Sequence, residues 1–177
     1  MAIRKIAKLG HPVLRQQAKE VPIEHISTTE IQQVIDDMLE TVVDADGAGL
    51  AAPQIHVSKK IVVLRLDNET DFRTWINPVI TPTTDEYMLT FEGCLSVPGM
   101  RGAVARPTAI QVEGYDRHGK AFTLQLSDFS AVVAQHECDH LDGILYVDRV
   151  ESRTLAYMEE YRRYNKTLMN QLFQEEE

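Results

Sequence analysis

The chain has 177 residues, of which 44% are hydrophobic and 25% charged. This composition is typical of globular domains and unlike that of disordered or disulfide-stapled proteins, so we expect a single domain spanning residues 1–177. Its 27 acidic residues outnumber its 18 basic ones and give a formal net charge of −9. That is the wrong sign for a DNA-binding surface, and we expect no specific DNA binding.

The first predicted helix follows a capping sequence. Ser27, with Glu30 three residues later, has the form of a capping box. Apolar residues then recur at helical spacing at Ile31, Val34, Ile35, Met38, Leu39, Val42 and Val43. The helix should end within Asp44–Gly47. The next segment, Gly47–Gln54, is rich in glycine and is broken by a proline, so we expect a loop there.

Strands are predicted in the middle of the chain. Lys60–Leu66 and Thr74–Thr81 are short and rich in β-branched residues. Because Pro78 cannot donate a ladder hydrogen bond, the second strand must bend or lie at a sheet edge. Alternating apolar residues on both sides of the turn Asp116–Gly119 predict a β-hairpin over residues 108–126.

A second helix is predicted after Ser127 or Asp128, either of which can cap it, and should end at Asp142–Gly143. Its apolar face consists of Phe129, Val132, Val133, His136, His140 and Leu141. Both histidines should therefore lie on the buried side. A last helix is predicted from Glu151 to Phe173. The elements together indicate an α+β fold, in which small antiparallel β-sheets pack around a central helix and another helix ends the chain.

The sequence contains no segment typical of membrane insertion or export. No apolar run approaches the roughly 20 residues of a transmembrane helix, and residues 1–9 lack the apolar stretch of a signal peptide. The two cysteines, Cys94 and Cys138, cannot build a disulfide framework. We expect a soluble, cytoplasmic protein that does not bind membranes and whose thiols are free for chemistry or for a metal ion.

The second predicted helix carries the sequence His136-Glu137-Cys138-Asp139-His140. A spacing of four places both imidazoles on one helix face, one turn apart, where they can bind one metal ion. Glu137 can reach a water molecule at the metal without being a ligand, as a general base must. The pattern predicts metal-assisted hydrolysis, against the alternative of two histidines at the edge of the core.

A catalytic site of this kind usually has three protein ligands, and several residues compete to be the third. The metzincin pattern requires a histidine where this chain has Tyr146, so that class is excluded. A thermolysin-like site would take Glu159 or Glu160 from the following helix. This alternative remains open.

Either cysteine is a further candidate for the third ligand. Cys138 lies about 200° around the helix from His136, so its sulfur should point away from the metal. Cys94 lies in an extended segment bounded by Gly93 and Pro98, where the backbone can approach a metal closely. A free cysteine is more often a small buried hydrophobic residue than a ligand.

Three segments give the chain a recognisable pattern. In order, they are Gly47–Gln54 (GAGLAAPQ), Glu92–Ser96 (EGCLS) and Gln135–Leu141 (QHECDHL). They closely resemble the signature segments of peptide deformylases, and the resemblance covers essentially the whole chain. It implies a deformylase fold and a metal-dependent hydrolase that removes the formyl group from nascent polypeptides beginning with formyl-methionine. Formate would be the second product.

The resemblance also implies the metal site. Cys94, His136 and His140 would hold one divalent ion, and Glu137 would be the general acid and base. The resemblance points to Fe²⁺ in cells, although a thiolate with two imidazoles also suits Zn²⁺, Co²⁺ and Ni²⁺.

The same match assigns residues to the substrate. Gln54 and the backbone N–H of Leu95 would donate to the oxyanion that forms during hydrolysis. Val132 and Val133 lie a turn before His136 on its helix, so they are expected, with Leu95 and Gly93, to line a pocket for an unbranched thioether side chain. The residues expected to bind substrate are Gly49, Gly93, Val132 and Val133.

Charged residues near the motifs receive supporting roles. Glu92 and Arg106 are expected to form an ion pair that braces the Cys94 strand, and Asp139 to accept a hydrogen bond from a ligand imidazole. The last helix would have a basic side suited to contact with the ribosome. Its residues are Arg149, Arg153, Arg162, Arg163 and Lys166.

Two other functions stay open beside the deformylase. One is an endopeptidase that uses Glu159 or Glu160 as third ligand. The other is a non-catalytic metal or redox-sensing module in which Cys94 senses oxidation.

Overall fold

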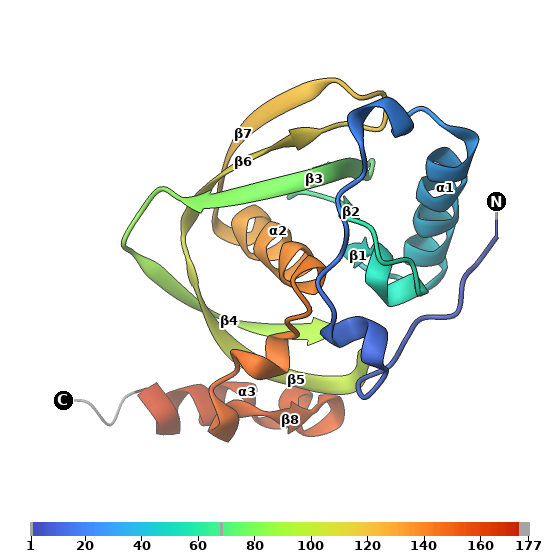
Figure 1. Ribbon diagram of the computed structural model, residues 1–177. Coiled ribbons are helices and arrows are strands. Elements are labelled where there is room, and N and C mark those ends of the chain that lie inside the picture. Colours follow the sequence, from blue (N-terminus) through green and yellow to red (C-terminus); the bar gives the residue numbers. More distant parts are fainter. Residues whose placement is uncertain (1, 68, 174–177) are drawn as a thin grey trace.

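The computed structural model describes residues 2–67 and 69–173. Figure 1 shows how its elements are arranged. In chain order they are α1 (Thr29–Asp44), β1 (Gly49–Ala51), β2 (Ile61–Leu64), β3 (Arg73–Pro82), β4 (Tyr87–Cys94), β5 (Val97–Pro107), β6 (Ala109–Tyr115), β7 (Ala121–Ser127), α2 (Asp128–Leu141), β8 (Ala156–Tyr157) and α3 (Met158–Phe173).

A five-stranded antiparallel sheet, in the order β1-β2-β3-β6-β7, carries a main helix on each face. Successive side chains of a strand point to opposite faces. Accordingly, Ile61 and Val63 of β2 pack with α1, while Val62 and Leu64 pack with α2. Because both faces are covered, all four are fully buried. This explains why β2 is a continuous apolar run.

A second sheet, in the order β4-β5-β8, closes the other side of α2. In Figure 1, α2 lies in the middle of the molecule, with the larger sheet on one side and the β4–β5 hairpin on the other. The predicted α+β fold with a central helix is therefore confirmed. No helix in the described part of the chain combines the length and the apolar character that crossing a membrane requires.

Helix α1 matches its prediction in extent but not in its cap. The N-cap residue Thr28 makes no side-chain capping bond, and its hydroxyl donates to the carbonyl oxygen of His25 instead. Val43 was predicted on the apolar face but is 64% exposed. Asp37 and Thr41 are buried on α1 instead, because the N-terminal segment covers them and Arg4 hydrogen-bonds to both.

The segment predicted as a loop, Gly47–Gln54, contains strand β1 and the start of a 3-10 turn, Ala52–Ile55. That prediction was wrong because β1 gains order from tertiary pairing with β2, which local composition does not reveal. In β3, the register shifts between Ile76 and Val79, around Pro78. The strand therefore bends as predicted, but it lies inside the sheet and not at its edge.

The predicted hairpin over residues 108–126 is confirmed by β6 and β7. The β4–β5 hairpin was predicted only as an extended segment around Cys94. The last helix begins at Met158 and not at Glu151, because residues 152–157 form a 3-10 turn and β8, which pairs with β5. Phe129, predicted on the buried face of α2, is 48% exposed.

Two residues of α1 provide a test of this burial pattern. Ile35 is fully buried between α1 and the sheet, so Ile35→Ala should lower the free energy of unfolding by about 2–5 kcal/mol. Val43→Ala, on the same helix at an exposed position, should change it by less than about 0.5 kcal/mol. Urea denaturation measures both. Equal effects would contradict the arrangement of α1.

Candidate metal centre

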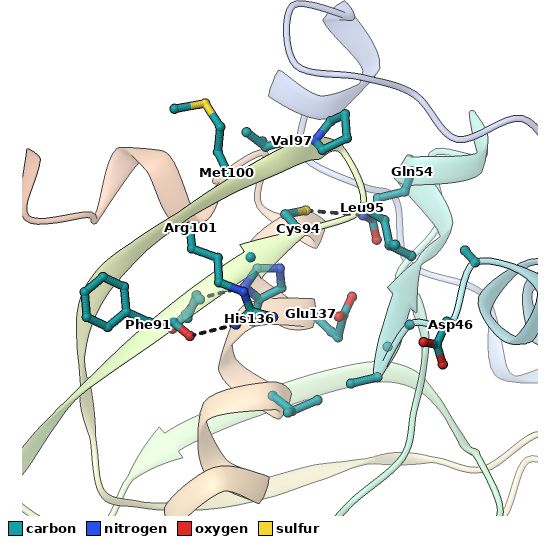
Figure 2. A pocket seen from close by; sticks show the side chains of 18 of the residues that line it. Asp46, Gln54, Phe91, Cys94, Leu95, Val97, Met100, Arg101, His136 and Glu137 are labelled. Atoms are coloured by element: carbon teal, nitrogen blue, oxygen red, sulfur yellow. Dashed lines mark hydrogen bonds and ion pairs between the residues drawn. The ribbon is translucent and has the colours of Figure 1, made fainter. Parts of the chain in front are cut away.

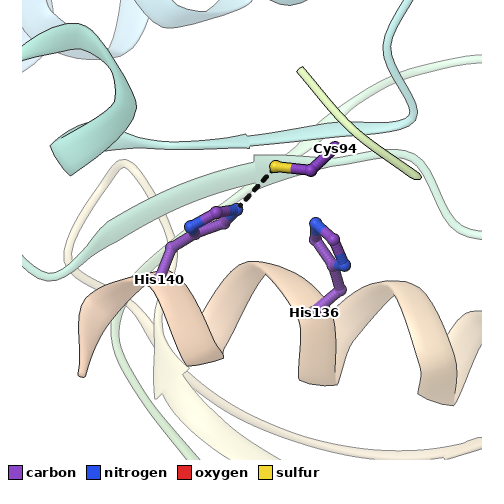
Figure 3. A group of neighbouring side chains, drawn as sticks. All are labelled: Cys94, His136 and His140. Atoms are coloured by element: carbon purple, nitrogen blue, oxygen red, sulfur yellow. Dashed lines mark hydrogen bonds between the residues drawn. The ribbon is translucent and has the colours of Figure 1, made fainter. Parts of the chain in front are cut away.

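Three metal-ligating side chains meet where the end of β4 passes over α2. His136 and His140 rise from one face of α2 toward Cys94, as Figure 3 shows. The Cys94 Sγ lies 3.3 Å from Nε2 of His140, and ligand atoms of all three residues lie within 4.8 Å of one another. One thiolate and two imidazoles form a donor set suited to a transition metal. The residues present therefore fit one such ion.

The strand pairing beside Cys94 is irregular. The register of β4 against β5 shifts between Glu92 and Cys94, and an irregularity of this kind can change the direction of the side chain that follows it. The backbone N–H of Ser96 approaches the sulfur to 3.4 Å, and the side-chain amide of Gln54 approaches it to 3.6 Å. Both donors point at the sulfur, which suits a ligand that carries negative charge.

A buried carboxylate orients His136. Its Nδ1 lies 2.8 Å from Oε2 of Glu92, which leaves Nε2 for the metal. Arg106 binds the same carboxylate through two contacts of 2.5 and 2.9 Å, and both partners of this ion pair are buried. The ion pair was predicted. Although burial opposes the charge of Glu92, the bonds from Arg106 and His136 lower its pKa.

The role predicted for Asp139 is wrong. Its carboxylate accepts hydrogen bonds from Arg106 and Arg149 and from neither ligand imidazole. Glu92 binds the imidazole of His136 instead, because its position two residues before Cys94 places it over α2. The sequence signal was the two-residue spacing between Glu92 and Cys94. Glu92 was predicted only to pair with Arg106 and so to brace the Cys94 strand.

The pKa values of the two histidines shift in opposite directions. Burial lowers the pKa of His140 well below the usual range. In His136 burial acts in the same direction, but hydrogen bonds with Cys94 and Glu92 outweigh it and raise the pKa well above the usual range. The Nδ1 proton of His136 is thus held against Glu92.

Glu137 is buried beside the three donors. Its Oε2 has no hydrogen-bond partner among the described residues, and burial raises its pKa to about 7. Such a carboxyl group can accept and return a proton near neutral pH. A Cβ added at Gly49 would lie 2.5 Å from Oε1 of Glu137, so only glycine leaves room for this carboxylate.

Cys94, His136 and Glu137 line a cleft of about 540 Å³, shown in Figure 2. The structure brings into its wall all the residues expected to act on substrate: Gly49, Gln54, Gly93, Leu95, Val132, Val133 and Glu137. It adds lining residues that the sequence did not indicate. Among them are Asp46, Phe91, Met100, Arg101, Phe129 and Met158.

The alternative third ligands lie elsewhere. Cys138 lines a separate cavity behind α2, and burial raises its pKa far above the usual range. Glu159 and Glu160 are in the first turn of α3, and neither belongs to the Cys–His–His group found in the described part of the chain. Tyr146, at the metzincin position, stacks on His136 with ring centroids 6.2 Å apart.

Comparison with known proteins gives one consistent family. The profile of the polypeptide deformylase family matches residues 3–156. A peptide deformylase of Leptospira biflexa is 44% identical over 164 residues, covering 88% of this chain and 92% of the relative. One from Dehalococcoides mccartyi is 47% identical over 152 residues, covering 86% and 89%. A Met-Ala-Ser-bound class I type b peptide deformylase from Acinetobacter baumannii has a TM-score of 0.79 at 33% identity, covering 84% of this chain and 98% of that one.

The two cysteines provide a matched test of the donor set. Cys94→Ala should lose tightly bound metal, because one of three donors is removed. Cys138→Ala should keep it, because this thiol lies behind the helix. Metal analysis after dialysis measures both. A metal-free Cys138→Ala protein beside a normal Cys94→Ala protein would overturn the assignment.

Proposed function

Since this chain belongs to the polypeptide deformylase family, we propose that Cys94, His136 and His140 hold the metal ion with which it works. The chain is a hydrolase that removes the N-formyl group from the N-terminal formyl-methionine of new polypeptides and releases formate. The proposed site rests on one observation: these three donors meet beside a buried carboxylate oxygen of Glu137 that has no hydrogen-bond partner among the described residues.

Glu137 is the general acid and base in this proposal. A bound divalent ion would lower the pKa of a water molecule and polarise the formyl group. Glu137 would take a proton from the attacking water molecule and later give it to the departing amine. Its burial, its position next to His136 and its pKa of about 7 support both transfers.

Gln54 and the backbone N–H of Leu95 stabilise the negative charge that develops on the formyl oxygen. The Gln54 side chain is already oriented: its Oε1 accepts from the Ala51 N–H at 2.8 Å, and its Nε2 donates to Ser96 Oγ at 3.1 Å. The NH₂ group is thereby turned toward Cys94. Donors held in place before reaction need no reorganisation when the charge forms.

The methionine side chain of the substrate occupies the part of the cleft formed by Gly49, Gly93, Val132 and Val133. The two valines supply an apolar wall, and the glycines leave space beside it. The Acinetobacter relative was crystallised with Met-Ala-Ser bound, which supports a peptide beginning with methionine.

Fe²⁺ is the ion we propose for the enzyme in cells, with Zn²⁺, Co²⁺ or Ni²⁺ as alternatives that the same donors accept. The place of action is the cytoplasm, where new chains emerge. Helix α3 is the proposed contact with the ribosome, through Arg162, Arg163 and Lys166. Arg149 and Arg153, predicted on this helix, precede its first residue, Met158.

Removing the base while keeping the ligands tests the role of Glu137. Glu137→Gln should retain its metal and lose formate release by at least about 100-fold, because general acid–base catalysis contributes about 10²- to 10⁴-fold. Metal content and formate release are measured on the same sample. A metal-loaded variant with near-normal turnover would remove Glu137 from the mechanism.

Substrate choice tests the function as a whole. Formyl-Met peptides should be hydrolysed about 100-fold faster or more than acetyl-Met peptides, because the extra methyl displaces the reacting carbon and a shift of about 1 Å can cost around 10²-fold. Formyl-Asp peptides should also be poor substrates, since a carboxylate beside Val132 and Val133 would be desolvated without a partner.

The measurement is kcat/KM for these three peptides, otherwise identical in sequence. A blocked peptide with only internal bonds serves as the control. Equal rates for formyl and acetyl substrates, or faster cleavage of the internal bond, would favour the endopeptidase over the deformylase.

A further inference from the structure

Five charged or ionisable side chains connect the metal centre with the protein surface. His136 Nδ1 contacts Glu92 at 2.8 Å, and Arg106 binds Glu92 at 2.5 and 2.9 Å. Arg106 Nη1 also donates to Asp139 at 2.8 Å. Arg149 then binds both oxygens of Asp139, at 2.8 Å each. The series alternates in charge, and each member contacts the next.

The series begins and ends on the same helix. His136 and Asp139 both belong to α2, while Glu92 lies on β4 and Arg106 on β5. Exposure of the side chains rises outward, from 3–4% in the Arg106–Glu92 pair to 13% in Asp139 and 45% in Arg149. Arg149 is therefore the end of the series that solvent can reach.

We propose that Arg149, acting through Asp139, is a positioning residue for the metal ligand His136. This inference rests on the proposed metal site and adds to it a remote residue that touches neither metal nor substrate. Arg149 is the C-cap of the 3-10 turn Tyr146–Asp148, so the segment after α2 would set how firmly a ligand on α2 is held.

Arg106 divides its N–H donors between two carboxylates. Its Nε and Nη2 donate hydrogen bonds to Glu92, and its Nη1 donates one to Asp139. With Arg149 bound to both of its oxygens, Asp139 offers Arg106 one edge only. Without Arg149, the Asp139 carboxylate is free to turn and take a second N–H of Arg106, because the arginine fork favours bidentate carboxylate pairing. Arg106 would then bind Glu92 less firmly, and Glu92 would in turn orient the ring of His136 less firmly.

Metal release from the full-length protein loaded with Co²⁺ tests this chain of contacts. Loss of a direct partner of a metal-bound histidine typically costs about 10- to 100-fold in metal affinity. Because Arg149 acts through intervening residues, we expect Arg149→Met to speed Co²⁺ loss to a chelator by about 3- to 10-fold. The absorption bands of the bound Co²⁺ should shift at the same time.

Asp139→Asn distinguishes positioning from a simple electrostatic field. If only the field mattered, removing the positive Arg149 would slow loss of the cation, and removing the negative Asp139 would speed it. Positioning predicts faster loss in both variants. The double variant should then lose Co²⁺ no faster than the more affected single variant, because both act on one series of contacts.

The control is Arg73→Met. Arg73 has a similar exposure, 43%, and also binds a carboxylate, that of Glu69, but on β3 and outside the series. It should leave Co²⁺ loss and the spectrum unchanged.

Unchanged or slower Co²⁺ loss in Arg149→Met, opposite effects of the two variants, or additive effects in the double variant would overturn the proposal. An equal effect of Arg73→Met would do so too. Failure of the unsubstituted protein to bind Co²⁺ would instead contradict the metal site itself, and with it everything built on that site.

Discussion

The buried ion pair between Arg106 and Glu92 is the interaction on which the site depends. It joins the β4–β5 hairpin to α2, since Glu92 also binds His136 and Arg106 also binds Asp139. Cys94 lies two residues after Glu92, so the same contacts set the separation between the thiol and the imidazoles. Removing one partner of such a pair typically costs about 3–5 kcal/mol, because the other charge stays buried and unpaired. Two elements far apart in the chain are thereby held at a spacing that could accommodate a metal ion.

The position of α2 between two sheets explains the electrostatics of the centre. Burial makes ionisation costly, so charged groups there need partners. Glu92, Arg106 and Asp139 satisfy one another, whereas Glu137 has a carboxylate oxygen without a hydrogen-bond partner among the described residues. The same burial that raises the pKa of Glu137 to about 7 makes it suitable for moving a proton. A buried carboxylate oxygen without a hydrogen-bond partner in the described part of the chain thus lies where the proposed chemistry needs a proton acceptor.

Particular elements show why some predictions succeeded. Helix α2 and the β6–β7 hairpin have strong local signals, namely apolar periodicity and a turn sequence, and both formed where expected. The prediction for the segment that contains strand β1 failed because Gly49 and the nearby proline suggest a loop. Pairing with β2 orders this segment. The predicted start of the last helix was wrong for a similar reason, because residues 156–157 pair with β5 as a strand.

The sequence by itself determined the chemistry of the candidate site. Spacing of four on a helix places His136 and His140 together, and the three motifs indicate Cys94, Glu137 and the family. Only the tertiary structure decided which acid binds His136. Asp139 is near in sequence but turns toward Arg106 and Arg149, while Glu92 reaches His136 from another strand. The relative position of two side chains on a helix depends on residues within one turn of each other. A hydrogen-bond partner from β4 depends instead on how the β4–β5 hairpin packs against α2, and no local sequence pattern encodes that packing.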